Sequence, residues 1–227
     1  MDAGHLALAA ASFLTAFAAS VAARAARRRR PTGESRGPGI ALEVWWWLGG
    51  FAIFLFGIEA TWVVVAPMPA LVARGIGGLM ALFAVLALAA LSHYLGYLAW
   101  GMKKHATFVA FGAGAMWMAE VGIILQTPDA AIAGEPLLFV FLSQAGKIGL
   151  AVGITLIGVT LASTLILAGI VGRIEEPVAR RRGALFAGAV AAVALAPLVG
   201  MLVADASLVL ACGLGAGSVT LLAAYAG

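Results

Sequence analysis

Three charged side chains fall inside long apolar segments of the sequence: Glu59, Glu120 and Lys147. A charge within a lipid bilayer is costly, so each of these residues is a candidate for binding or transport. Counted from the predicted outer ends of their helices, Glu59 lies about seven residues deep, Glu120 about six and Lys147 about ten. Gln144 precedes Lys147 by three residues and shares its helix face. We predict that these four residues line a ligand or ion pocket in the outer half of the membrane.

The same charged residues have two other interpretations. A buried Lys–Glu pair can fix the way helices pack without binding any ligand. Alternatively, the three side chains never meet and extend separately to the membrane interface. Two acids with one lysine leave an extra negative charge when all are ionised. A proton retained on one glutamate is therefore what a cation site or a proton-coupled site would require.

A second polar cluster is predicted toward the inner side of the third apolar segment, formed by His93, Tyr94 and Tyr97. His93 and Tyr97 share one helix face, and we expect His93 to be hydrogen-bonded between helices. A haem held by two histidines is not expected, because His5, His93 and His105 fall at different depths. The acidic residues are too sparse for a di-metal site and one cysteine, Cys212, cannot form a CxxC motif. We therefore expect no cofactor and no metal.

The composition identifies the elements that must position these residues. The chain has 227 residues, of which 63% are hydrophobic and 11% charged, and its mean hydropathy is +1.07. A soluble domain of this size could not bury so much apolar surface. The composition excludes a soluble enzyme, a disordered chain and a disulfide-rich secreted domain, and it predicts an integral membrane protein.

Seven apolar segments are long enough to cross a bilayer as helices, and their connections are too short to hold a soluble domain. The fifth is too long, because one straight helix would reach about 54 Å against a hydrocarbon core of about 30 Å. It either projects from the membrane or breaks near Gly146. We predict one all-α domain over residues 1–227, a polytopic seven-helix transmembrane bundle with helices near His5–Ala23, Val44–Ala66, Ile76–Gly101, Ala106–Gln126, Leu137–Gly172, Ala184–Ala204 and Ser207–Ala226.

The distribution of positive charge predicts the orientation of this bundle. Of the fourteen Lys and Arg residues, all but Arg74 and Lys147 fall in connections on one side. The positive-inside rule then places the N-terminus outside and the C-terminus inside, in the cell inner (plasma) membrane. The arginine runs are explained by this topology, so no nucleic-acid partner is expected despite a pI of about 9.7.

The sixth segment carries small residues at every fourth position, which is typical of close helix packing in membranes. Packing within the chain is the simpler interpretation, and a homodimer face is the alternative. The row comprises Ala184, Gly188, Ala192, Ala196, Gly200 and Ala204.

The overall plan resembles seven-helix modules of uncharacterised prokaryotic membrane proteins and of the N-termini of some sensor kinases. The residues that carry the resemblance are Trp45–Trp62 with Glu59, Ser92–Lys104 (SHYLGYLAWGMKK) and the basic hairpin Arg173–Arg182. In such sensors a cytoplasmic signalling domain follows the last helix, whereas this sequence stops at Gly227. A microbial rhodopsin is excluded, because the last segment has no lysine for a Schiff base.

No catalytic motif accompanies the buried charges, and no nucleophile–base pair can be named, so an enzyme is the least supported class. The leading hypothesis is a non-catalytic membrane module that binds a small or lipidic ligand, or a partner membrane subunit, in the outer half of the bundle. One alternative is a small transporter or proton-coupled channel. It predicts a polar path from the charged cluster toward His93 and Tyr97. Another is an accessory subunit of a membrane redox or secretion complex.

Overall fold

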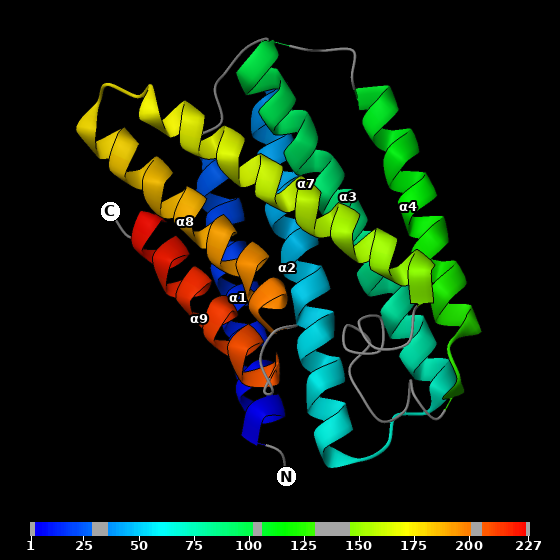
Figure 1. Ribbon diagram of the computed structural model, residues 1–227. Helices are drawn as coiled ribbons and strands as arrows, with labels where there is room; N and C mark the ends of the chain where they lie inside the picture. The colour runs from blue at the N-terminus through cyan, green and yellow to red at the C-terminus, as the bar shows by residue number, and fades with distance from the viewer. Residues whose placement is uncertain (1–2, 29–35, 102–105, 130–145, 201–205, 226–227) are drawn as a thin grey trace.

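The computed structural model describes residues 3–28, 36–101, 106–129, 146–200 and 206–225. Within these ranges the chain is all-helical, with seven helices and no strand (Figure 1). The helices are α1 (Ala3–Arg28), α2 (Arg36–Val65), α3 (Ala70–Trp100), α4 (Ala106–Gln126), α7 (Gly146–Gly172), α8 (Pro177–Gly200) and α9 (Ala206–Tyr225).

Four stretches of the described helices are long and apolar enough to cross a membrane: Ala3–Arg28, Gly39–Val65, Ala70–Leu98 and Ser207–Tyr225. Large apolar side chains also lie on the outer surface, as at Phe111, which is 76% exposed. Water disfavours such a surface, whereas lipid tails accept it. The length, the composition and the exposed apolar surface together indicate a membrane protein.

Successive helices run in opposite directions, and the first and last helices are neighbours (Figure 1). α1 packs against both α2 and α9. α8 packs against both α7 and α9. α3 packs against α2 and α4, while α4 has its main contacts with α3 and α7 and lies at the edge of the bundle (Figure 1). α7 crosses the face of α3 at a steep angle (Figure 1).

The contact of α8 with α9 depends on residues without bulky side chains. A Cβ added at Gly213 would collide with the Cβ of Ala196, and one at Gly217 would lie 3.2 Å from the carbonyl oxygen of Ala189. The row of small residues on α8 therefore meets Gly213 and Gly217 over part of its length. In this row Ala192 and Ala196 face α9, Gly188 approaches Thr220, and Ala184 is exposed. The surroundings of Gly200 and the whole of Ala204 lie outside the described part of the chain.

Three helices begin earlier than hydropathy indicates. α2 begins at Arg36 instead of Val44, α3 at Ala70 instead of Ile76, and α8 at Pro177 instead of Ala184. Hydropathy detects the apolar part of a helix, but the backbone ladder continues into polar residues when a cap satisfies its first N–H groups.

For α8 this cap is visible. The Glu176 carboxylate accepts hydrogen bonds from the N–H groups of Val178 (3.0 Å) and Ala179 (2.6 Å). Pro177 at the first helical position has no N–H that needs a partner. The three arginines at 180–182 consequently belong to the first turns of α8 and not to a connection.

The fifth apolar segment is helical from Gly146 to Gly172. The predicted portion before Gly146 lies outside the described residues. α7 is therefore described as a helix of 27 residues, which at about 1.5 Å per residue is long enough for one crossing.

Candidate functional site

Glu59 is one of the most completely buried side chains of the described protein, with 1% of its surface exposed. It lies on α2 between Phe56 and Ala60, which pack against Leu8 and Leu214 of α1 and α9. Its burial removes the carboxylate from water. A carboxylate in such a position is costly unless other polar groups compensate it.

Glu120 is buried on α4, with 4% of its surface exposed. Its neighbours on the same helix face, Trp117 and Ile124, pack against α3 near Ala81. The indole Nε1 of Trp117 donates a 3.3 Å hydrogen bond to the carbonyl oxygen of Gly78 and orients this face of α4 toward α3. Glu120 Oε1 is buried and has no hydrogen-bond partner among the described residues.

The two carboxylates occupy matching positions in their helices. Glu59 precedes the end of α2 by six residues and Glu120 precedes the end of α4 by six, which corresponds to about 9 Å along each helix. These two helix ends lie at the same end of the bundle, and both helices pack against α3 (Figure 1). The fold therefore places the two acids on two helices that share α3 as a neighbour.

The other two residues of the predicted pocket, Lys147 and Gln144, are described only in part or not at all. Lys147 is the second residue of α7, a helix that packs against α3 and α4. Its side chain, and the whole of Gln144, lie outside the described part of the chain. The structure thus describes both acidic side chains and the helix that carries the lysine.

An ion pair closes the nearby end of the α3–α4 hairpin. Arg74 on the first turns of α3 donates from one nitrogen, Nη2, to Asp129 Oδ1 (2.7 Å) and to the carbonyl oxygen of Thr127 (2.7 Å). This contact holds the segment after α4 against the start of α3. Sequence analysis did not pair these two charged residues, because they are far apart in the sequence.

The second predicted polar cluster is divided between two surfaces of α3. His93 lines a pocket of about 240 Å³ between α3 and α4, whose other lining residues, Val85, Ala113 and Trp117 among them, are almost all apolar. Tyr94 packs with Leu167 of α7 and so belongs to another contact. Tyr97 is half-buried one turn further along, where its carbonyl oxygen accepts the N–H of Gly101.

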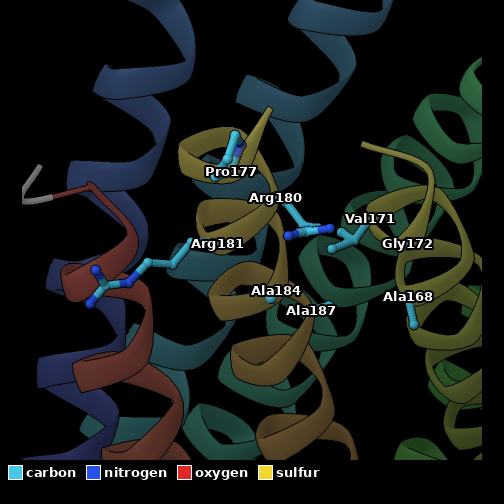
Figure 2. Close-up of a pocket in the computed structure, with 8 residues that line it drawn as sticks. All are labelled: Ala168, Val171, Gly172, Pro177, Arg180, Arg181, Ala184 and Ala187. Atoms are coloured by element: carbon cyan, nitrogen blue, oxygen red, sulfur yellow. The ribbon is translucent and has the colours of Figure 1, made fainter. Parts of the chain in front are cut away.

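A larger pocket of about 610 Å³ lies where α7 leads into α8 (Figure 2). Arg180 and Arg181 line it together with small apolar residues. Sequence analysis interpreted these arginines first as a topology signal and did not predict a pocket beside them. The signal for this pocket is a basic run with a glycine, a proline and small residues on both sides of it. Small side chains leave space between two helices.

Within the described residues, no group of three or more His, Cys, Asp or Glu side chains is arranged to hold a metal ion. The described site is therefore one of buried carboxylates in apolar surroundings. It can accept hydrogen bonds or balance a positive charge. The class that the fold defines is an all-helical membrane protein. No protein-family model, curated protein or solved structure matches the chain.

Proposed function

We propose that the protein is a seven-span module of the cell inner (plasma) membrane, N-terminus outside, that binds a small or lipidic ligand through its buried carboxylates. The ligand carries a hydrogen-bond donor or a positive charge on an apolar body. The binding level is that of Glu59 and Glu120, in the outer half of the bundle. The proposed role is non-catalytic.

The observation that carries this proposal is the buried and unpartnered Oε1 of Glu120. Leaving a buried acceptor without a donor costs about 1–3 kcal/mol, and more for a charged group. A bound donor would remove this penalty, so the free energy of binding would include the relief of an existing cost. Lys147 is a candidate to balance part of the charge, since α7 packs against α4.

The position of α4 also favours binding from the lipid phase. α4 lies at the edge of the bundle, and its outward side chains Phe111 and Met118 are strongly exposed. Its glycines Gly112, Gly114 and Gly122 have open space where a Cβ would stand. A ligand could therefore reach the α3–α4 contact without passing through the tightly packed helices.

Transport is less well supported by the described residues. A proton or ion path would need polar groups between Glu120 and His93. The α3–α4 pocket that ends at His93 is instead lined by Leu82, Val85 and Leu86 on its α3 side. Such a lining would block an ion, whereas it suits the apolar body of a ligand.

Profiling of co-purifying molecules tests the proposal. Wild-type protein, Glu120→Gln and the control Glu175→Gln are purified in one mild detergent, denatured and extracted for mass spectrometry. Glu175 is exposed in the α7–α8 turn, so its variant makes the same chemical change away from the site. We expect a molecule that is retained by the wild type and by Glu175→Gln and is depleted about tenfold in Glu120→Gln, the loss of roughly one charge-assisted hydrogen bond.

Identical profiles for the wild type and Glu120→Gln would contradict the proposal, as would a wild type that retains no such molecule. If a protein is retained in place of a small molecule, the site belongs to a partner subunit. The same carboxylate would then accept a hydrogen bond from a donor on a helix of that partner.

A further inference from the structure

The α7–α8 hairpin forms an open pocket on the surface of the bundle. The two helices touch where a Cβ at Gly183 would lie 2.7 Å from Val171 Cγ2, and Val171 also forms part of the pocket wall. The pocket has a volume of about 610 Å³, which is within the roughly 300–1,000 Å³ of ligand sites. Its walls are lined by Ala168, Val171, Gly172, Pro177, Arg180, Arg181, Ala184 and Ala187.

The wall residues divide into an apolar part and a cationic part. Ala168, Ala184 and Ala187 present only methyl groups, so the space between the helices is apolar. Arg180 extends from α8 toward Val171 and places its guanidinium across this space, whereas Arg181 extends from the same turn toward α9 (Figure 2). An open, mostly apolar pocket beside a guanidinium group matches a molecule with an apolar tail and an anionic head.

The charges around the pocket strengthen this match. No acidic residue lines it. The carboxylate of Glu176, the residue before α8, accepts hydrogen bonds from the backbone N–H groups of Val178 and Ala179 at the start of the helix. Arg180 and Arg181 form no ion pair within the described residues, so their charge is available to a ligand. Guanidinium groups bind phosphate oxygens in a bidentate geometry.

We propose that this pocket binds one anionic phospholipid of the surrounding membrane. Its acyl chain lies along the alanines of α7 and α8, and its phosphate contacts Arg180. Basic pockets between helices at the membrane surface are the usual sites for such headgroups. The inference requires only that these helices lie in a membrane, and it is independent of the ligand proposed at Glu120.

Native mass spectrometry tests this assignment on the full chain. The protein is released from micelles that contain equal amounts of phosphatidylglycerol and phosphatidylcholine, and the lipids that stay bound are counted. The wild type should retain one phosphatidylglycerol in preference to phosphatidylcholine. Arg180→Gln should lower the retained fraction about fivefold, as expected for one arginine near a phosphate.

Arg28→Gln is the matched control, because it removes one exposed arginine near the end of α1, outside the pocket. It should leave the retained fraction unchanged. Ala184→Phe provides a test that keeps every charge and fills the cavity, and it should also expel the lipid. This second variant keeps the proposal testable if Arg180→Gln does not fold.

Three results would overturn the proposal. One is equal retention of the two lipids by the wild type. Another is an equal loss in Arg180→Gln and Arg28→Gln, since it would reflect general surface charge and not a pocket. The last is displacement of phosphatidylglycerol by inorganic phosphate at millimolar concentration, which would assign the site to a free phosphate ion.

Discussion

The bundle has a tightly packed region, formed by α1, α8 and α9, and a loosely packed region around α4. In the tight region a Cβ at Gly213 would collide with Ala196, and the Thr15 and Ser218 hydroxyls are 2.8 Å apart between α1 and α9. In the loose region, a Cβ added at Gly112 or Gly122 would have no neighbour within 4 Å among the described residues. A pocket of about 240 Å³ separates part of α4 from α3.

The difference teaches how one chain combines stability with a binding site. Helices in lipid gain little from the hydrophobic effect, so close packing of small residues supplies much of the stability. The tight region has this packing. The loose region carries the buried carboxylate of Glu120, which costs free energy while its Oε1 is unpartnered. We interpret the first region as the scaffold and the second as the part adapted to binding.

Among the variants that test this comparison, we expect the largest change in the free energy of unfolding from one methyl group added in the tight region. Gly213→Ala should lower the free energy of unfolding by about 1–3 kcal/mol, because the new Cβ would overlap Ala196 and separate α8 from α9. Reversible denaturation in mixed micelles measures this change.

The same substitution in the loose region, Gly112→Ala, is the control. It meets open space, and alanine favours a helix more than glycine does, so the variant should gain up to about 1 kcal/mol. Equal destabilisation by the two variants would remove the distinction between the regions.

A smaller effect is expected for the polar contact between α1 and α9. Thr15 Oγ1 lies 2.8 Å from Ser218 Oγ, and each hydroxyl oxygen also lies within hydrogen-bonding distance of a carbonyl oxygen of its own helix (2.7 Å and 2.6 Å). Because each hydroxyl has one proton, the contact between the helices is made when one hydroxyl donates to the other. A double-mutant cycle with Thr15→Val and Ser218→Ala should give a coupling free energy of about 0.6 kcal/mol, the usual value for such contacts in membranes. A coupling free energy near zero would mean that methyl and methylene packing alone joins α1 to α9.

Much of the fold could be predicted from sequence, because apolar segments of spanning length are a strong signal. Seven apolar segments were predicted, and the described residues form seven helices. The early starts of α2, α3 and α8 could not be read from hydropathy. At α8 the cause is the capping by Glu176, which allows the arginine run to be helical.

The candidate site could be predicted only in part. The spacing from the helix ends predicts a common depth for Glu59 and Glu120, since the rise of a helix is constant, and this common depth stays a prediction. Their burial depends on how α2 and α4 are rotated, and no residue pattern determined that rotation. His93 and Tyr94 illustrate the difficulty, because adjacent residues on α3 contact different helices.

The most direct test of the central claim measures the unfolding free energy of Glu120→Met together with its co-purifying molecule. If Glu120 serves binding, the variant loses the molecule, and its ligand-free form is as stable as the wild type or more stable by about 1–3 kcal/mol, because an unpartnered buried acceptor has been removed. A loss of more than about 2 kcal/mol, as when one partner of a buried pair is removed, would contradict the account and make Glu120 a structural residue.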